Sequence, residues 1–326
     1  MPPKVSVIIP LYNKVPHIAR AIKSVLAQTI QDFEIIVMDG NSTDGGPEIV
    51  KNFTDPRIHF WVQRGSGVSA ARNQGVEKSQ SDFITLLDAD DEWMPNHLEV
   101  LFRLKQRFPE AGLYATAYQT CFVSGKLVDS NCQAISKSSF EGLLPNYFES
   151  AALGKTEPVW TSAVGISKKL FVEAGGFQTE VSMGEDIDLW AKIALKYPSA
   201  FSTDISAIYH TEASNRACDS PHPMEELILV KNAKKAIDDG IVPKKMLLHL
   251  NMYIARKEID TAVINIFAGD YPLARKVLAR VEPRYFWQEK YTWSIIARIP
   301  KPIFDQVRRT KKFITIGFIR LKRKKN

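Results

Sequence analysis

The first 115 residues alternate between strand-like and helix-like patterns, and this alternation limits the fold more than any other feature of the chain. Four short apolar runs are separated by segments whose apolar residues recur at helical spacing. The predicted strands lie in KVSVIIP, FEIIVMDG, RIHFWVQ and DFITLLDAD, and two of the predicted helices lie in VPHIARAIKSVLAQ and GVSAARNQGVEKS. Such alternation is typical of a mostly parallel sheet with helices on its faces. We therefore predict an α/β fold for this part of the chain.

Polar side chains follow three of these four apolar runs. They are Tyr12 and Asn13 after the first run, Asp39 after the second, and Asp88, Asp90 and Asp91 after the fourth. In open parallel sheets, ligands bind beyond the carboxyl ends of the strands. We therefore expect these side chains to converge on one crevice.

The segment FITLLDADDEW places three carboxylates directly after a strongly apolar strand. In an extended chain Asp88 and Asp90 point to the same side and Asp91 points to the other. Carboxylate oxygens suit Mg²⁺, Mn²⁺ or Ca²⁺, and Mg²⁺ is commonly shared between one or two carboxylates and substrate phosphates. The segment predicts a divalent-cation site. The alternative is a solvated turn that also caps the following helix.

The rest of the chain divides into a less regular part and a helical part. GEDIDLWAKIALKYP predicts a helix with Glu185 and Asp186 at its start. From about Pro221 onward the pattern is helical, and AVINIFAGDYPLARKVLARVEP resembles one helix–turn–helix unit. The predicted organisation is a catalytic domain, a helical C-terminal region and a basic amphipathic tail, at residues 1–218, 219–299 and 300–326.

The composition is ordinary for a globular protein, with 45% hydrophobic and 24% charged residues. No apolar run approaches the roughly 18 residues of a membrane-spanning helix, and the N-terminus lacks the anatomy of a signal peptide. The three cysteines, Cys121, Cys132 and Cys218, are odd in number and indicate neither a disulfide framework nor a zinc site. These features fit a reducing cytoplasm.

The net charge of +7 is concentrated at the C-terminus. Ala297 to Asn326 contain eleven Lys and Arg against one acid, so this segment carries +10 and the remainder about −3. Apolar residues at positions 303, 307, 314, 318 and 321 lie close to one helical stripe. A basic amphipathic helix is typical of membrane-surface binding. We predict peripheral attachment to an anionic membrane surface, on its cytoplasmic face, through residues 301–326. The alternatives are a packed C-terminal helix and nucleic-acid contact, and no nucleic-acid motif supports the latter.

Five motifs occur in the order VSVIIPLYN, VMDGNSTDGG, GVSAARNQG, LLDADD and GEDIDLW. Over about residues 3 to 215 the chain resembles a family 2 glycosyltransferase of the GT-A fold. The resemblance implies an inverting hexosyl transfer from a nucleotide-diphosphate sugar, usually a UDP-sugar, to the hydroxyl of a sugar or lipid-linked sugar acceptor. It also implies a Mn²⁺ or Mg²⁺ cofactor and a role in cell-surface polysaccharide or glycolipid synthesis.

The resemblance assigns donor-binding roles to residues of the first four motifs. Pro10, Tyr12 and Asn13 are expected along the nucleotide, and Asp39 is expected to accept a hydrogen bond from the nucleobase. The alternative for Asp39 is an Asx turn with the next residues. Gly40 stands where many relatives carry a second acid, which leaves Asp39 alone in this role.

The same resemblance assigns the charges around the diphosphate. Arg72 is expected near the base or diphosphate, with a surface salt bridge as its alternative. Asp88 is expected to touch the ribose or donor sugar, and Asp90 to be the direct metal ligand. His210 is a candidate metal or diphosphate contact, and its alternative is a hydrogen-bonded structural histidine.

The fifth motif is expected to supply the general base. An acceptor hydroxyl is a poor nucleophile until its proton is removed. The resemblance points to Asp186 as this base, with Glu185 supporting it. The alternative is that acids in a first helical turn simply interact favourably with the helix dipole. Trp190 is expected to be core or wall packing, whereas Trp160 fits acceptor stacking and core packing equally.

Two other classes of protein share parts of this pattern. A nicotinamide dehydrogenase needs G-x-G-x-x-G between its first strand and helix, where this chain reads PLYNKVP. A catalytically retired sugar-nucleotide-binding module would keep the fold but is expected to lose acids such as Asp90 and Asp186, and both are present.

Overall fold

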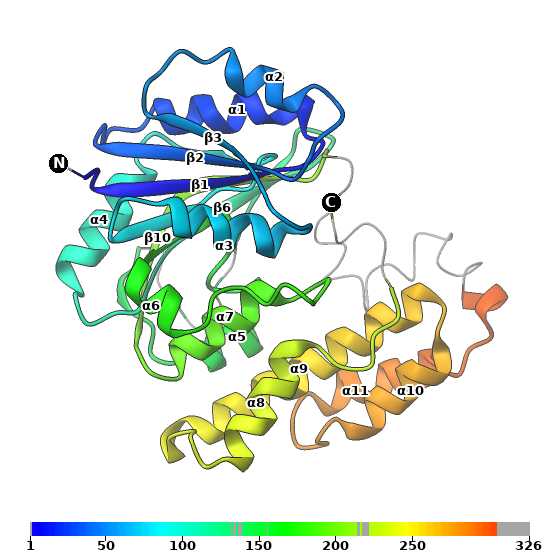
Figure 1. Ribbon diagram of the computed structural model, residues 1–326. Helices are drawn as coiled ribbons and strands as arrows, with labels where there is room; N and C mark the ends of the chain where they lie inside the picture. The colour runs from blue at the N-terminus through cyan, green and yellow to red at the C-terminus, as the bar shows by residue number, and fades with distance from the viewer. Residues whose placement is uncertain are drawn as a thin grey trace.

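The computed structural model describes residues 2–130, 132, 135, 139–154, 156–213, 216 and 222–304. Its centre is a ten-stranded sheet with the strand order β3-β2-β1-β4-β9-β6-β10-β5, to which β7 and β8 are added beside β6 and β10. Helices cover both faces of the sheet, and a helical bundle formed by the C-terminal part packs beside it (Figure 1). The predicted α/β class with a helical C-terminal part is confirmed.

The strands expected from the sequence occur where they were predicted. The first four are β1 (Val5–Leu11), β2 (Phe33–Asp39), β3 (Ile58–Val62) and β4 (Phe83–Leu86), and their pairings are all parallel. The later strands are β5 (Glu92–Trp93), β6 (Leu113–Cys121), β7 (Leu127–Asp129), β8 (Glu141–Leu143), β9 (Val164–Ser167) and β10 (Ser199–His210). Because β9 runs antiparallel between β4 and β6, the whole sheet is mixed: β1 to β4 form one parallel block, and β6 and β10 form a second parallel pair.

Two apolar clusters, one on each face, hold the sheet. In β1 the side chains of Val7 and Ile9 enter one cluster and Ile8 enters the other, as the two-residue period of a strand requires. The first cluster packs α1 (Val15–Leu26), α2 (Gly46–Lys51) and α4 (His97–Arg107). The second packs α3 (Val68–Lys78), α5 (Tyr147–Leu153), α6 (Lys168–Glu173) and α7 (Glu185–Ala194). The molecule is therefore layered helix, sheet and helix.

Helix α3 lies unusually close to the sheet. A Cβ added to the buried Gly75 would lie 2.4 Å from Ile8 Cγ2 in β1, which is far inside van der Waals contact. Glycine at this position therefore allows the helix to seat on β1 and β2. The close approach fixes the direction in which side chains earlier on α3, including Arg72, leave the helix.

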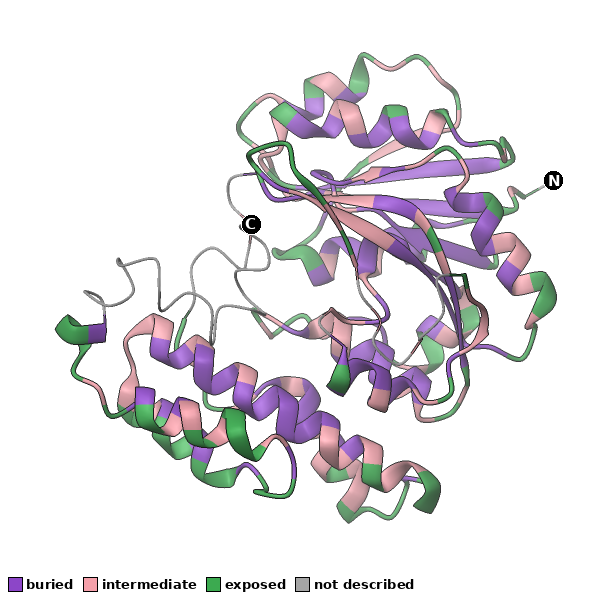
Figure 2. Ribbon diagram, turned by 180° about the vertical axis from the view of Figure 1, so that it is seen from behind, coloured by how far each residue is buried: buried purple, intermediate pink, exposed green. Residues whose placement is uncertain are grey.

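The C-terminal part contains α8 (Ile228–Asp238), α9 (Lys244–Ala268), α10 (Tyr271–Arg280) and α11 (Trp287–Ile296). The predicted helix–turn–helix is present: Gly269 ends α9 with φ +88°, and Asp270 caps α10 by accepting from the Leu273 amide at 2.9 Å. Helices α8 and α9 share the apolar cluster of α5 and α7, and α9 is buried along much of its length (Figure 2). The predicted domain boundary at residues 218 and 219 lies outside the described residues, as does most of the tail.

None of the helices in the described residues is long and apolar enough to cross a membrane. This agrees with the absence of a long apolar run in the sequence.

His97 provides a test of the core through its pH dependence. Its ring is fully buried, stacks on Trp93 at 4.2 Å between centroids and places Nδ1 2.8 Å from Ser206 Oγ. Burial lowers the pKa of His97 to about 3, whereas an unfolded histidine titrates at about 6.5. Between pH ~3 and ~6.5 the His97 side chain is therefore protonated in the unfolded chain and neutral in the folded one. Because of this difference, the free energy of unfolding falls by about 1.4 kcal/mol for each unit by which the pH is lowered in this range.

We expect the urea midpoint to fall more steeply below pH ~6.5 in the wild type than in His97→Gln, which cannot titrate. The glutamine can still hydrogen-bond to Ser206. Equal slopes for the two proteins would show that His97 is not buried as an unprotonated ring.

Candidate functional site

The turns after β1 and β2 are bound to each other. Asn13 adopts a left-handed conformation with φ +50°, which asparagine tolerates better than most residues. Its amide donates to Ser42 Oγ at 3.0 Å, and its side-chain oxygen accepts from the Thr43 amide at 2.8 Å. The two segments that the sequence predicted to flank one site are therefore held in contact.

Asp39 ends β2 directly beside Leu11 of β1 and is buried. Its two carboxylate oxygens accept from the Ser42 amide at 3.3 and 3.2 Å, so the turn considered as an alternative role is formed. A carboxylate has about four acceptor sites, so this turn does not exhaust its capacity to bind a ligand. The neighbouring Tyr12 is 58% exposed.

Gly40 and Pro10 complete this side of the site. A Cβ on Gly40 would lie 3.3 Å from both Leu11 O and Tyr12 Cδ2. A larger residue there would press on the Leu11 carbonyl and on the tyrosine ring. Pro10 is half-buried near the end of β1, opposite Met38 of β2.

The loop after β4 is anchored by Asp91, whose side chain points into the protein. The Ser162 hydroxyl donates to its Oδ2 at 2.6 Å, and the His210 amide donates to its Oδ1 at 3.2 Å. Burial, together with the charges of Asp90 and Asp88, raises the pKa of Asp91 well above its usual range. The chain turns here, with the Asp91 amide donating to the Asp88 carbonyl at 2.9 Å, so the alternation expected for an extended chain does not apply. Asp91 ties the loop to the short 3-10 helix η1 (Thr161–Ala163) and to β10.

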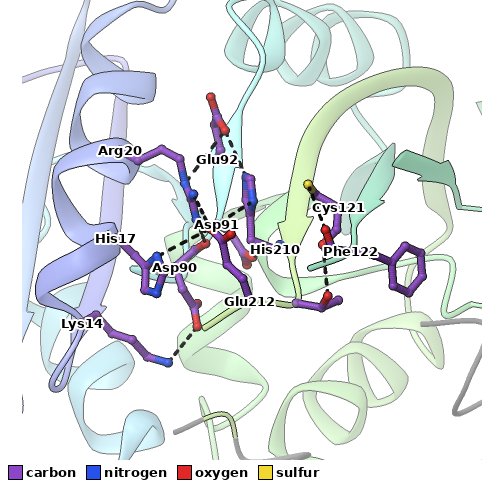
Figure 3. A network of polar contacts seen from close by, with 11 residues as sticks. Lys14, His17, Arg20, Asp90, Asp91, Glu92, Cys121, Phe122, His210 and Glu212 are labelled. Atoms are coloured by element: carbon purple, nitrogen blue, oxygen red, sulfur yellow. Dashed lines mark hydrogen bonds and ion pairs between the residues drawn. The ribbon is translucent and has the colours of Figure 1, made fainter. Parts of the chain in front are cut away.

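Asp90 is held by two cationic side chains from the α1 region (Figure 3). Its Oδ2 lies 2.8 Å from Lys14 Nζ, and each of these two side chains is only 12% exposed. The Arg20 guanidinium donates to the backbone oxygen of Asp90 at 2.7 Å and to Glu212 Oε1 at 2.8 Å. In this structure the Asp90 carboxylate therefore binds a cation, the ammonium group of Lys14.

Arg72 connects the acidic loop to helix α7. One terminal nitrogen lies 2.6 Å from Asp88 Oδ1 and the other lies 2.9 Å from Glu185 Oε1. The guanidinium is buried, and its Nε has no hydrogen-bond partner among the described residues. The surface salt bridge considered as an alternative does not describe Arg72, because this ion pair is internal.

Helix α7 begins with the two acids that the sequence singled out. Burial and the Asp186 charge raise the pKa of Glu185, and Arg72 opposes this shift. Among the described residues, the donors to Asp186 are neutral: Thr161 Oγ1 donates to its Oδ2 at 3.1 Å, and the Ile187 amide donates to its Oδ1 at 2.8 Å. Glu185 is therefore ion-paired with Arg72, whereas the Asp186 carboxylate forms no ion pair with the described residues.

His210 lies behind the acidic loop (Figure 3). Its Nε2 is 3.1 Å from Glu92 Oε2, and its Nδ1 is 3.8 Å from Glu212 Oε1. Burial and the Arg20 charge lower the pKa of His210, and the two glutamates oppose this shift. Both ring nitrogens of His210 thus lie near carboxylates, which agrees with the alternative role of a hydrogen-bonded structural histidine. The backbone amide of His210 donates to Asp91.

The two tryptophans differ in environment. Trp190 is fully buried, so the prediction of a packing role is confirmed. Trp160 is half-buried and packs against Tyr118 at 4.4 Å and Tyr209 at 5.4 Å between ring centroids.

Sequence reasoning missed several residues of this site. They are Lys14, Arg20, Thr161 and Ser162. Lys14 directly follows the PLYN motif, which is the one local signal that could have drawn attention to it. The others look like ordinary surface or turn residues, because their partners are distant in sequence.

The predicted residues form one connected group at the carboxyl edge of the parallel strands. Asp39 reaches Asn13 through Ser42, and the next residue, Lys14, binds Asp90. From the same acidic loop, Asp88 reaches Glu185 through Arg72, and Asp186 is the residue that follows Glu185. The ends of β1, β2 and β4 are therefore linked by contacts at one edge of the sheet, and their convergence on one ligand site stays a prediction.

A divalent cation fits this group of residues only if a substrate supplies some of its ligands. Within the described residues, no three His, Cys, Asp or Glu side chains are arranged to hold a metal by themselves. Asp90 already holds a cation, and Asp88 follows the same strand. One or two carboxylates completed by substrate phosphates and water is the usual arrangement for Mg²⁺.

The sequence profile of Glycosyl transferase family 2 matches residues 6–148. An uncharacterized glycosyltransferase of Rickettsia bellii is 34% identical over 196 residues, which are 59% of this chain and 26% of that protein. The putative colanic acid biosynthesis glycosyl transferase WcaA of Escherichia coli K12 is 31% identical over 218 residues, or 64% of this chain and 74% of that protein.

A third relative is the Campylobacter jejuni GalNAc(5)-diNAcBac-PP-undecaprenol beta-1,3-glucosyltransferase. It is 33% identical over 152 residues, or 42% of this chain and 47% of that protein. The chain spans only 26% to 30% of the rickettsial relatives that it matches.

Solved structures share the fold at low sequence identity. Staphylococcus aureus TarS 1-349 in complex with UDP-GlcNAc gives a TM-score of 0.64 at 15% identity and covers 94% of this chain and 92% of that chain. The mannosyltransferase PcManGT of Pyrobaculum calidifontis, in complex with GDP-Man and Mn²⁺, gives 0.60 at 18% identity and covers 98% of this chain and 83% of that chain.

Proposed function

Because the chain belongs to the family 2 glycosyltransferases, we propose that it transfers a hexosyl group from a nucleotide-diphosphate sugar to an acceptor hydroxyl with inversion. The observation that carries this proposal is the set of ion pairs at the acidic loop: Asp90 binds Lys14, and Asp88 binds Arg72, which also binds Glu185, the neighbour of Asp186 in α7. It joins a cation-binding carboxylate, a buried guanidinium and a carboxylate without an ion pair at one edge of the sheet.

The donor nucleotide is proposed to lie on the β1 and β2 turns. Asp39 is oriented by the Ser42 amide and retains acceptor capacity for the N–H of a uracil. Exposed Tyr12, with Asn13 and Pro10, would line the nucleotide. A UDP-sugar is favoured because a carboxylate accepts but cannot donate, and uracil presents an N–H at its pairing edge.

The diphosphate is proposed to lie between Asp90 and Arg72. Asp90 would be the direct ligand of Mn²⁺ or Mg²⁺, with Asp88 nearby toward the ribose or donor sugar. When bound, the cation would neutralise the charge that develops on the leaving diphosphate. Lys14 would have to leave the Asp90 carboxylate, and its ammonium would then be available to the phosphates. The guanidinium of Arg72 is buried and pre-positioned by two acids, so it adds a fixed positive charge.

Asp186 is proposed as the general base. Its donors, Thr161 and its own helix, orient the carboxylate without the cation that Glu185 holds. Asp186 would take the proton of the acceptor hydroxyl as the oxygen attacks the anomeric carbon. Attack from the side opposite the diphosphate inverts that carbon. Glu185 would support the site by holding Arg72.

The acceptor is proposed to be a sugar or lipid-linked sugar in polysaccharide or glycolipid synthesis. The names of two relatives support this class, since one refers to colanic acid biosynthesis and the other to an undecaprenol-linked glycan. A basic tail at residues 301–326, of which only 301–304 are described, would bring the enzyme to the inner membrane surface. His210 stays a predicted contact to the metal or diphosphate.

The proposal is tested by the thermal stability of the purified chain with nucleotide-sugars, with and without Mn²⁺. A ligand that binds only the folded state stabilises it by about 2.7 kcal/mol at ~100 times its Kd. We expect a UDP-sugar to raise the Tm in the presence of Mn²⁺ and much less in EDTA. No shift with any nucleotide-sugar would contradict the proposal. A shift without sugar transfer or donor hydrolysis would favour the retired binding module instead.

A further inference from the structure

Helix α11 is apolar on two faces, and only one of them is covered in the described structure. Trp293, Ile296 and the following Ala297 are buried in a third apolar cluster with α9 and α10. In Figure 1 the helix lies in this C-terminal bundle, at a distance from the helices that cover the sheet. Its inward face therefore has an ordinary packing role.

The outward face carries Trp287, Tyr291 and Ile295, which are 57%, 55% and 65% exposed. They recur every four residues and so form one stripe, called here the α11 stripe. The rings of Trp287 and Tyr291 lie 6.4 Å apart between centroids. Single exposed apolar residues are normal on a protein surface, but an aromatic and aliphatic row on one helix face indicates an interaction surface.

The charges beside the α11 stripe are predominantly positive. Arg298 and Lys301 are exposed and follow Ile295 within six residues. The acids nearby are paired: Glu289 contacts the Arg256 guanidinium, and Glu282 contacts Arg284 at 2.6 Å. The surface thus combines apolar rings with cations.

The basic tail begins at the same bundle. Phe304 is buried in the third cluster, with its ring 5.9 Å from that of Phe267 and 6.3 Å from that of Tyr271. The next 22 residues, 305–326, contain nine Lys and Arg and one acid. Whatever these residues contact, they start from a point fixed to the bundle that displays the α11 stripe.

We propose that the α11 stripe docks on an anionic phospholipid bilayer. Trp and Tyr have apolar rings with polar tips, which suit the lipid–water interface. Arg298 and Lys301 would contact the lipid phosphates beside them. This inference rests on the proposed membrane attachment through the tail, and it adds a folded surface that fixes how the enzyme lies on the membrane.

The test is sedimentation of the full chain with phosphatidylcholine vesicles, with and without phosphatidylglycerol. The stripe variant combines Trp287→Ser, Tyr291→Ser and Ile295→Ser. A matched control combines Val123→Ser, Val172→Ser and Ile241→Ser, which are apolar residues elsewhere that are 77%, 64% and 62% exposed. We expect the stripe variant to partition about 10-fold less onto anionic vesicles, since burial of apolar area and charge attraction both set such binding. The control variant should bind like the wild type.

A third protein, lacking residues 305–326, separates this inference from the proposal on which it rests. If the truncation abolishes binding and the stripe variant binds normally, the tail attaches and the α11 stripe does not, so this inference fails alone. If the wild type does not bind anionic vesicles, both fail. A stripe variant that changes the oligomeric state, with unchanged vesicle binding, would assign the surface to a second copy of the chain. Unchanged Tm values in all variants verify that each is folded.

Discussion

Asp186→Asn is expected to lower the rate of sugar transfer by about 10³-fold, within the range typical of losing a general base. Asparagine keeps the size of the side chain: its amide oxygen can accept from the Ile187 amide, and its NH₂ can donate to the Thr161 hydroxyl, which then acts as acceptor. It cannot take the proton of the acceptor hydroxyl. Donor affinity is expected to change little, because Arg72 contacts Asp88 and Glu185 rather than Asp186.

Transfer is measured with saturating donor, and donor affinity is measured separately by calorimetry. Glu185→Gln is the matched control, since it alters the adjacent acid of the same helical turn. We expect it to weaken donor binding through Arg72, with a smaller loss in transfer rate than Asp186→Asn. Near-normal turnover of Asp186→Asn, or a greater loss in Glu185→Gln, would move the base to Glu185. The raised pKa of Glu185, caused by burial and Asp186, makes that outcome chemically reasonable.

Asp90→Asn is expected to remove Mn²⁺-dependent donor binding, with a loss of metal affinity above about 100-fold. Replacing a residue that only hydrogen-bonds to a metal ligand typically lowers metal affinity by about 10- to 100-fold. Asp90 is proposed as a direct ligand, so its replacement should cost more. The Arg20 contact to its backbone oxygen should survive, so the loop is expected to keep its position. Calorimetry with UDP, in Mn²⁺ and in EDTA, measures the effect.

His210→Gln is the control for the metal assignment. The His210 ring has Glu92 and Glu212 beside its nitrogens, and its link to Asp91 runs through the backbone amide. If these contacts define its role, His210→Gln leaves Mn²⁺ affinity nearly unchanged. A loss comparable to that of Asp90→Asn would instead make His210 a metal contact. Equal metal affinity in wild type and Asp90→Asn would refute the assignment of Asp90.

Much of the fold was predictable because it depends on local periodicity. The strands ending at Leu11, Asp39 and Leu86 follow from apolar runs, and their parallel pairing follows from the helical segments between them. The antiparallel β9 within the sheet was not predicted. Its pairing with β4 and β6 depends on which strand edges the rest of the sheet leaves open.

The site was predictable to the extent that its residues end strands or begin a helix. Asp39, Asp88, Asp90 and Asp186 could be placed at one edge from topology and resemblance, and their roles stay proposals. Lys14 as the partner of Asp90 was not predicted, although it lies next to a recognised motif. A lysine at the start of an amphipathic helix usually faces solvent. The pattern of apolar residues therefore did not predict that Lys14, the N-cap of α1, lies half-buried against a carboxylate.

The sequence by itself determined the order of strands and helices and the acids that follow them, because side chains repeat with fixed local periods. Only the tertiary structure decided which charges meet. Arg72 and Glu185 are 113 residues apart and are joined at 2.9 Å because α3 seats on β1 while α7 packs on the same face of the sheet. Such a contact depends on sheet order and close packing between elements, which are properties of the folded chain rather than of any segment of it.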